Sequence, residues 1–521
     1  MSLLRKQNAR TGMSKPSADR DAESRSRGAL IAVDLGAESC RISLLRWVGD
    51  QPEIEVVHRL QNSADDRAGG LRWDITALCK GVEDGLRQCA KLAPEGITAV
   101  GVDGWAVDYV RLGEDGKPVE NPFCYRDKRT LESQRRVHSR ISPERLYELT
   151  GVQILSLNTL YQLAADGDKT QKLPWINLPE YVMHWLGGKR VSEYTNATHT
   201  QLLGVRDKTW SPEIFAAAGL ELNAAPPLVR PGADIGRLQG PLADLPAFRF
   251  TTLIVPACHD TASAIAGIPA QGDDWGFISS GTWSLVGCVL DSPCVLADAQ
   301  NGNFSNEGGV GNRIYFLKNV NGMWLLRQCI EHWKSLGDSW TVEELIAECA
   351  GLKAPNFLFD VDHPDLLLPG DMPSRINAQL KIVGRSPIPD GHEMAPAMAN
   401  LIFHSLADRY AAVFRAAKKI TGKPLKRLYI VGGGSKNTLL NRLTAKATGL
   451  EVLPGSTEST TVGNFAVQLA ALDGDYTDAT GVSAGAVARW AHTLATQPIL
   501  AQNIRARKVD GTQPGIGEAL A

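Results

Sequence analysis

The stretch Ala29-Leu-Ile-Ala-Val-Asp34-Leu-Gly-Ala-Glu-Ser-Cys-Arg-Ile-Ser-Leu-Leu45 decides how the chain folds. Its first apolar run ends on the acid Asp34, a glycine soon follows, and apolar residues then resume. This order predicts a strand, a tight turn and a second strand. Helical spacing follows over Asp74–Leu92 and another apolar run over Ile97–Val102, so the sequence predicts an α/β fold.

The same plan recurs in the second half of the chain. Within Trp275–Leu290 an apolar run, a glycine turn and a second apolar run follow one another. A long helix is predicted over Pro396–Ile420, and the apolar segment Arg427–Val431 leads into three glycines. We therefore expect two α/β halves, separated near the breaker-rich stretch Gly267–Asp274.

Length and composition limit the class of protein. The 521 residues are 43% hydrophobic and 21% charged, with a formal net charge of -2. At roughly 150 residues per domain this length predicts two to four domains, and the weak net charge argues against a nucleic acid or an anionic membrane as partner. No apolar run reaches the length of about 18 residues that a membrane-spanning helix needs. The nine cysteines form no CxxC pair, which favours free thiols and a cytoplasmic location.

Both ends of the chain are expected to be tails. Residues 1–28 are rich in Arg and Ser and lack the apolar segment of a secretory signal, so we expect a disordered tail there. Residues 496–521 are expected to form a second tail.

Two turns are candidates for binding phosphate. The chain contains neither GxxxxGKS nor GxxxxGKT, and the glycines at 432–434 do not extend to GxGxxG because residue 437 is Asn. The turns Asp34–Ser39 and Ser279–Thr282 each follow a strand and contain glycine and hydroxylic residues. Backbone N–H groups in such turns can hold a phosphate, and Asp34 can hold Mg²⁺ through water. An ordinary hairpin is the alternative for each turn alone.

Two further motifs allow a structural and a functional interpretation. Asp260 lies where a strand meets a helix, so it is either a helix N-cap or a general base that accepts a proton from a hydroxyl nucleophile. Gly432-Gly433-Gly434 is either a tight strand-to-helix corner or a surface for a flat ligand such as adenosine.

Aromatic and charged side chains gather in Asp103–Asp108 and Tyr125–Arg129. Sugars bind to aromatic faces together with carboxylates and arginines, so this composition suits a polyol. A buried tryptophan beside an ion-pair network is an equally good interpretation of the same residues.

A set of motifs relates most of the chain to a known family. They are Val33-Asp-Leu-Gly-Ala37, Trp105-Ala-Val-Asp108, Tyr125-Arg-Asp-Lys-Arg-Thr130, Asn158-Thr-Leu-Tyr-Gln162, His259-Asp-Thr-Ala-Ser-Ala264, Ser279-Ser-Gly-Thr-Trp-Ser284, Asn306-Glu-Gly-Gly309, Leu317-Lys-Asn319 and Val431-Gly-Gly-Gly434. On these residues the chain resembles the FGGY carbohydrate kinases of the actin-like ATPase superfamily, over about Ala29–Trp490. The resemblance implies two RNase-H-like domains, 29–268 and 269–495, with an inter-domain cleft for ATP and sugar.

The resemblance also implies roles for particular residues. Asp260 would be the catalytic base, and Asp34 would orient Mg²⁺. The sugar would contact Ala106, His259, Asp260, Thr261 and Asn319. The nucleotide would lie against Ala37, Glu38, Ser39, Cys40, Arg41, Thr282, Arg327, Gly432, Gly433 and Gly434.

Four residues depart from the family pattern. Glu38 stands where Ser is usual, Cys40 and Ala106 where Gly is usual, and Arg327 where Gln is expected. Within the family, the motif spacing resembles the branch that phosphorylates the 1-hydroxyl of L-rhamnulose, and this reaction is expected here with ATP and Mg²⁺. The alternatives are a kinase for L-fuculose or L-ribulose, and a non-catalytic nucleotide switch that responds to sugar.

Overall fold

The structure is a computed structural model that describes residues 28–67, 69–167, 170–495 and 499–501. Apart from residue 28 and residues 499–501, the two expected tails, 1–28 and 496–521, lie outside the described residues.

A seven-stranded sheet forms the centre of the first lobe, in the order β11-β12-β6-β1-β2-β3-β19. Strand β2 is antiparallel to both of its neighbours, β1 and β3, whereas β6 runs parallel to β1 and β12 runs parallel to β6. The strands are β1 (Ala29–Leu35), β2 (Ser39–Val48), β3 (Gln51–Gln61), β6 (Ile97–Gly104), β11 (Asp234–Arg237), β12 (Thr252–Ile254) and β19 (Ile499–Ala501).

A six-stranded sheet forms the centre of the second lobe and repeats this plan, in the order β15-β16-β14-β13-β17-β18. Its first strand, β13, is antiparallel to β14 and parallel to β17, as β1 is to β2 and β6. The expectation of two α/β halves is therefore confirmed. The strands are β13 (Trp275–Ser280), β14 (Trp283–Leu290), β15 (Ser305–Gly308), β16 (Ile314–Asn321), β17 (Arg427–Val431) and β18 (Glu451–Pro454).

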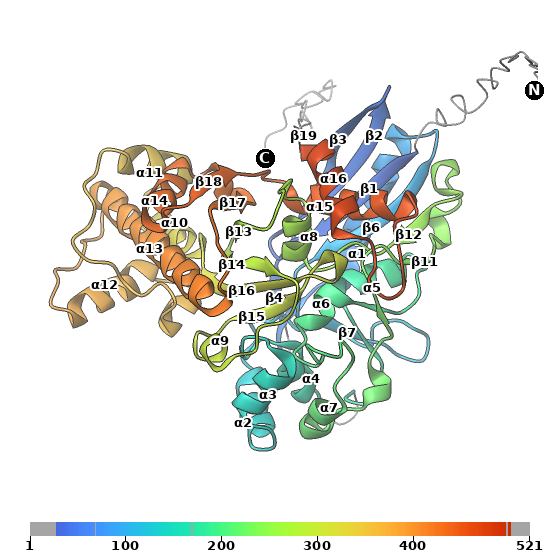
Figure 1. The fold of residues 1–521 in the computed structure, drawn as a ribbon, viewed down its shortest axis with the longest axis horizontal. Helices are drawn as coiled ribbons and strands as arrows, with labels where there is room; N and C mark the ends of the chain where they lie inside the picture. The colour runs from blue at the N-terminus through green and yellow to red at the C-terminus, as the bar shows by residue number, and fades with distance from the viewer. Residues whose placement is uncertain (1–27, 68, 168–169, 496–498, 502–521) are drawn as a thin grey trace, which may run out of the picture.

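The two sheets and their helices form five layers (Figure 1). Along β1, Ile31 and Val33 pack into one core while Leu30 and Ala32 pack into another, because successive side chains of a strand point to opposite faces. The outer layers are α1 (Ile75–Leu92) and α5 (Leu178–Trp185) on the first sheet, and α10 (Trp324–Ser335), α11 (Val342–Cys349), α12 (Met372–Ile382), α13 (Ala395–Thr421) and α14 (Thr438–Thr448) in the second lobe.

The middle layer consists of α8 (Asp260–Ala266), α15 (Ser459–Leu472) and α16 (Ala484–Ala495). Although α15 follows the second sheet in sequence, it is hydrogen-bonded to the first. Gln468 Nε2 donates to Ile31 O at 3.0 Å, and Asn464 Nδ2 donates to Gly101 O at 3.3 Å. The boundary at 268/269 remains a proposal about the sequence, because in space α15 completes the first lobe.

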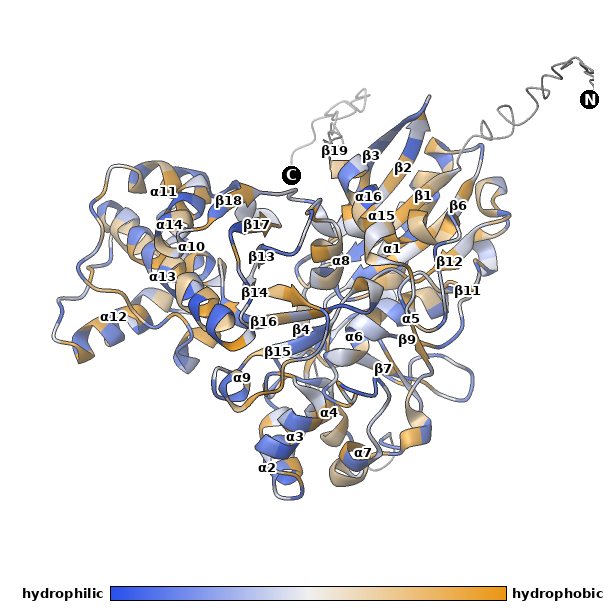
Figure 2. Cartoon of the chain, viewed as in Figure 1, coloured by the Kyte–Doolittle hydropathy of each residue, from blue (hydrophilic) through white to orange (hydrophobic). Residues whose placement is uncertain are grey.

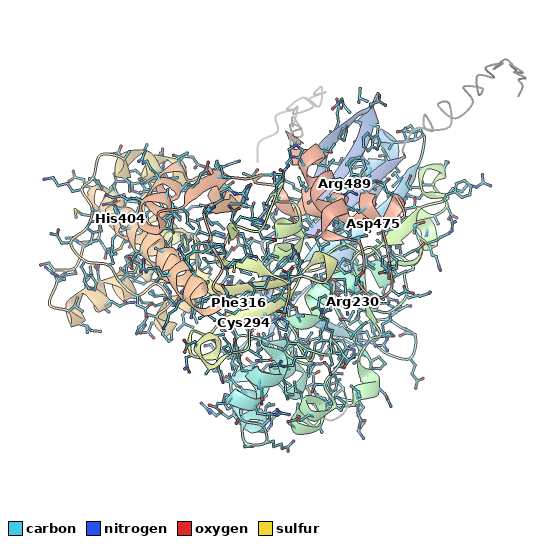
Figure 3. All side chains as sticks on the ribbon, viewed as in Figure 1. Arg230, Cys294, Phe316, His404, Asp475 and Arg489 are labelled. Carbon is cyan, nitrogen blue, oxygen red and sulfur yellow. The ribbon has the colours of Figure 1, made fainter. Side chains whose placement is uncertain are left out.

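A helical segment of the first lobe reaches the second lobe beside β15. It contains α2 (Thr130–His138), α3 (Pro143–Thr150), α4 (Thr159–Ala164), α6 (Tyr194–Thr198) and α7 (Pro212–Ala218). The Asn306 side chain donates to Gly151 O at 3.1 Å and to Cys294 O at 3.0 Å, so it fixes this junction. Asn306 pairs in register with Phe316 of β16, so it connects this strand with Cys294; Figure 3 labels Cys294 and Phe316. Short pairs join β4 (Ala64–Arg67) to β5 (Gly70–Trp73), β7 (Tyr109–Arg111) to β8 (Trp175–Asn177), and β9 (Ser192–Glu193) to β10 (Leu228–Val229).

Two observations concern the ends of the chain and its hydropathy. Ile499–Ala501, expected within the C-terminal tail, is strand β19 and runs parallel to β3. In the described part of the chain, no helix is both long and apolar enough to cross a membrane. Even the 27-residue helix α13 carries hydrophilic and hydrophobic residues side by side (Figure 2).

Candidate active site

Three carboxylates meet at the carboxyl ends of parallel strands. Asp34 of β1 is paired in register with Asp103 of β6, and Gly104 forms a bridge with His259, the residue before Asp260. Ligands of parallel α/β sheets bind outside the carboxyl ends of the strands. The expected site residues Asp34 and Asp260 are therefore brought together, and Asp103 joins them.

Asp34 and Asp103 are both buried, and their surroundings differ. Arg41 Nη2 lies 2.9 Å from Asp34 Oδ2. Asn464 Nδ2 donates to Asp103 Oδ2 at 2.5 Å, whereas Asp103 Oδ1 has no hydrogen-bond partner within the described residues. Burial, followed by the negative charge of Asp34, raises the pKa of Asp103 well above its ordinary value. A divalent cation would offset the negative charge of the two carboxylates. It would also coordinate the unpartnered Asp103 Oδ1.

Asp260 is the most accessible of the three carboxylates, with 33% of its side chain exposed. Its Oδ1 accepts a hydrogen bond from Thr261 Oγ1 at 3.2 Å and lies 3.4 Å from His259 Nε2. Burial against the protein, and then the charge of Asp34, raise the pKa of Asp260 to about 7. The N-cap of α8 is His259, not Asp260, so the capping interpretation of Asp260 does not hold. A carboxylate with such a pKa can accept a proton near neutral pH.

His259 contacts a second histidine that the sequence did not single out. The His199 and His259 rings lie 3.8 Å apart between centroids, and His199 Nε2 lies 3.0 Å from Glu307 Oε2. Burial, and then His199, lower the pKa of His259, so its ring is neutral at pH 7. The ligand atoms of these three residues lie within 4.8 Å of one another, so they form a second group able to hold a cation. Their proximity depends on three distant segments and leaves no pattern in the sequence.

Ala106 lies in a strained turn after β6. Asp108 N donates a hydrogen bond to Ala106 O at 3.0 Å, and the residue between them, Val107, has a φ of 70°. This hydrogen bond and this φ define a γ-turn. The Asp108 carboxylate accepts hydrogen bonds from Trp73 Nε1 at 2.7 Å and Trp105 Nε1 at 3.0 Å. Asp108 is thus a buried, satisfied group that shapes the turn, and the structural interpretation of this cluster fits it better than direct sugar binding.

Asn319, the predicted sugar residue of the second lobe, contacts the first lobe. It lies on β16, where its side-chain amide donates to Gln153 Oε1 at 3.1 Å and its backbone N–H donates to the same oxygen at 3.3 Å. Gln153 belongs to the helical segment of the first lobe and is buried. The pair therefore joins the two lobes. No signal in the sequence identified Gln153.

The residues predicted for the first phosphate turn, 37–41, differ in their surroundings. Cys40 is fully buried, its Sγ lies 3.5 Å from Gly36 O, and burial raises its thiol pKa to about 12. Arg41 Nη1 donates to Glu458 Oε2 at 2.8 Å in addition to its contact with Asp34. The side chains of Cys40 and Arg41 are thus engaged away from a phosphate, and only their backbone remains for that role. Ala37 and Glu38 lie in the turn between β1 and β2, and Ser39 is the first residue of β2.

The second phosphate turn meets the first across the two lobes. Thr282 lies between β13 and β14, and its Oγ1 donates to Glu38 Oε1 at 3.3 Å. Arg327, on α10, forms an ion pair with Glu38 and donates from Nη2 to Thr282 Oγ1 at 3.0 Å. The structure therefore brings together the three predicted nucleotide residues Glu38, Thr282 and Arg327.

The three glycines after β17 have different surroundings. Gly432 has a φ of 80°, and a Cβ there would lie 2.8 Å from Ser280 O. A Cβ on Gly434 would overlap the Ser280 side chain, whereas a Cβ on Gly433 would meet no atom within 4 Å. Packing therefore explains Gly432 and Gly434, and Gly433 is the one of the three that faces open space.

Comparison with known proteins places the chain in a family. The N-terminal domain of the FGGY family of carbohydrate kinases matches residues 29–267, and the C-terminal domain of that family matches residues 276–472. A rhamnulokinase of Bacteroides thetaiotaomicron is 36% identical over 87% of this chain and 92% of its own length. A rhamnulokinase of Pectobacterium carotovorum is 37% identical over 85% of this chain and 88% of its own length.

Solved structures support the fold. A ligand-bound xylulose kinase from Lactobacillus acidophilus covers 90% of this chain and 97% of its own with a TM-score of 0.70 at 16% identity. Plasmodium falciparum glycerol kinase with ADP covers 90% of this chain and 93% of its own with a TM-score of 0.69 at 12% identity. Both family domains, the similarity to the rhamnulokinases and the two-lobed fold agree, and the chain belongs to the FGGY family of carbohydrate kinases.

Proposed function

We propose that this protein transfers the γ-phosphoryl group of ATP to the 1-hydroxyl of L-rhamnulose and releases L-rhamnulose 1-phosphate and ADP. The similarity to rhamnulokinases over most of the chain supports this substrate. The observation that carries the chemistry is the placement of Asp260, a partly exposed carboxylate beside the buried pair Asp34 and Asp103 at the strand ends.

In this mechanism Asp260 accepts the proton of the sugar hydroxyl. The hydroxyl oxygen forms a bond to the γ-phosphorus while the bond from that phosphorus to the bridging oxygen breaks, and ADP leaves with the electron pair. Neutral His259 and the hydroxyl of Thr261 lie against Asp260 and orient the sugar from the first lobe. Asn319 contributes from the second lobe, so approach of the two lobes excludes water and favours transfer to sugar over hydrolysis.

The buried carboxylates fit a magnesium ion. Asp103 Oδ1 has no partner within the described residues, and Asp34 lies directly opposite in the neighbouring strand. Asp34 and Asp103 would hold the ion, either directly or through water, as Mg²⁺ prefers in phosphate sites. The ion would neutralise charge on the phosphates when bound. The backbone of residues 37–39 and of Thr282 would contact the phosphates, and Gly433 would lie under the adenosine.

The experiment is a panel of ketoses with ATP and Mg²⁺, monitored through formation of ADP. L-Rhamnulose should give the highest kcat/KM, ahead of L-fuculose and L-ribulose. Asp260→Asn should bind nucleotide but lose turnover by a factor of about 10² or more. Asp50→Asn, at an exposed carboxylate in the turn between β2 and β3, is the matched control and should retain activity.

The outcomes separate the alternatives. A higher kcat/KM with L-fuculose or L-ribulose would replace the substrate and leave the reaction intact. Binding of sugar and nucleotide without ADP formation would identify a switch in place of an enzyme. Near-normal turnover in Asp260→Asn would contradict the assignment of the base.

A further inference from the structure

Two of the residues that depart from the family pattern contact each other. Glu38 lies in the turn between β1 and β2 of the first lobe, and Arg327 lies on α10 of the second lobe, 289 positions along the chain. Their side chains form an ion pair, and both also contact the hydroxyl of Thr282. An acid in a phosphate turn is unfavourable alone, and here a cation from the other lobe neutralises it.

The contacts resemble those that a phosphate would make. Arg327 directs one guanidinium nitrogen to the Glu38 carboxylate and the other to Thr282 Oγ1 at 3.0 Å, while Thr282 Oγ1 donates to Glu38 Oε1 at 3.3 Å. Guanidinium and hydroxyl groups are the donors that bind phosphate oxygens, and a planar guanidinium binds carboxylate and phosphate by the same geometry. The Glu38 carboxylate thus accepts from donors suited to a nucleotide phosphate.

The ion pair between Glu38 and Arg327 is exposed enough for a ligand to displace one of its partners. The Glu38 side chain is 50% exposed and that of Arg327 is 33% exposed. Ion pairs of such exposure contribute little to stability, because water and salt screen them. A polyphosphate carries more charge than one carboxylate, so it can displace Glu38 from Arg327 without unfolding either lobe.

We propose that Glu38 is an internal competitor of the nucleotide: in the ligand-free protein its carboxylate occupies the phosphate-binding donors of Arg327 and Thr282, and the polyphosphate of the nucleotide displaces it. This inference rests on the proposed function and adds a regulation of its nucleotide site. Nucleotide affinity is then set by an exchange, in which the Glu38–Arg327 pair breaks as the Arg327–phosphate contact forms. No covalent bond changes in this step.

The test measures binding of ADP and of tripolyphosphate by calorimetry, without sugar and without Mg²⁺. Glu38→Gln should bind both ligands roughly fivefold more tightly, the scale of an exposed ion pair. Arg327→Gln should bind more weakly than the wild type, because it loses a donor and leaves Glu38 unneutralised. The double variant Glu38→Gln with Arg327→Gln should bind more tightly than Arg327→Gln alone, because the repelling charge is gone.

A matched control removes a similar ion pair at a distant place. Glu83 accepts from Arg87 at 2.7 Å on α1, and Glu83→Gln should leave the affinities for ADP and tripolyphosphate unchanged. Thermal unfolding of each variant verifies that it is folded. A repeat with Mg²⁺ distinguishes a competitor from a metal ligand, because a metal ligand would make Glu38→Gln bind Mg²⁺-nucleotide more weakly than the wild type.

The binding experiment distinguishes failure of the competitor proposal from failure of the proposed function. Unchanged or weaker affinity in Glu38→Gln, with nucleotide binding by the wild type intact, would overturn the competitor and leave the kinase proposal standing. Failure of every variant and of the wild type to bind ADP would overturn both proposals.

Discussion

At the scale of single residues, the environment of Asp260 sets the pH at which it can act as a base. Burial and the charge of Asp34 raise its pKa to about 7, so the carboxylate is protonated and inactive below that pH. We expect kcat/KM for the sugar to rise with pH through about 7 and then level off. Initial rates of ADP formation between pH 5.5 and 8.5, at a fixed excess of ATP and Mg²⁺, measure this profile.

The control for this profile is stability, since unfolding at low pH would mimic it. Because the folded-state pKa of Asp260 lies above its ordinary value, this group favours folding most at low pH, and that contribution is lost as pH rises through about 7. Loss of activity below pH 7 therefore cannot come from unfolding caused by Asp260. A rate that is constant from pH 5.5 to 8.5 would contradict the role of Asp260 as base.

Single residues were predictable where a local pattern marked them. Asp34 lies at the end of an apolar run before a turn, Asp260 lies where a strand gives way to a helix, and the structure brings them to one place. No local sequence pattern indicated His199 or Gln153. Their contacts with His259 and Asn319 join segments that are far apart in sequence. The roles of the site residues stay predictions until the variants are measured.

At the scale of elements, the turn after β17 contains tightly packed glycines and one glycine, Gly433, that is predicted to contact the nucleotide. Gly433→Ala adds a methyl group to open space, so it should preserve the thermal stability and weaken ADP binding by roughly fivefold or more through contact with the nucleotide. Calorimetry with ADP and thermal unfolding give the two quantities.

Gly434→Ala is the matched comparison within the same turn. Its methyl group would overlap the Ser280 side chain, so the variant should lose about 1–3 kcal/mol of unfolding free energy, with or without ligand. Equal affinity for ADP in Gly433→Ala and the wild type would exclude Gly433 from the nucleotide site.

The elements themselves were largely predictable. Apolar runs broken by glycine predicted the hairpins β1–β2 and β13–β14, and a long amphipathic segment predicted α13, which ends at Gly422 in the left-handed conformation. The partners of α15 were not predictable. This helix is buried along almost its whole length, so its sequence shows no single apolar face that would indicate the sheet it covers.

At the scale of the whole molecule, the residues predicted to bind the two ligands of the proposed reaction come from both lobes. The predicted sugar residues His259 and Asn319 belong to different lobes, as do the predicted nucleotide residues Glu38 and Gly433. Each ligand therefore favours the same approach of the lobes, and binding of one should tighten binding of the other by about fivefold or more. ADP and L-rhamnulose form no product together, so calorimetry can measure this coupling at equilibrium.

Thermodynamics supplies the control for this measurement. ADP must change the affinity for sugar by the same factor as sugar changes the affinity for ADP. Independent affinities would show that the two ligands do not share a closing movement.

The two-lobed fold was predictable because its plan occurs twice in the sequence, whereas the contacts between Glu38, Thr282 and Arg327 depend on how the lobes face each other.

Because α15 and α16 cover the inner face of the first sheet, the order of synthesis matters for this chain. Leu30 and Ala32 leave the ribosome more than four hundred residues before Phe465, which packs into the same core. Until then the nascent first lobe presents an apolar sheet face to solvent, a situation in which chains fold slowly and aggregate easily. Truncation before α15 should consequently give an insoluble product, although both strand hairpins would be complete.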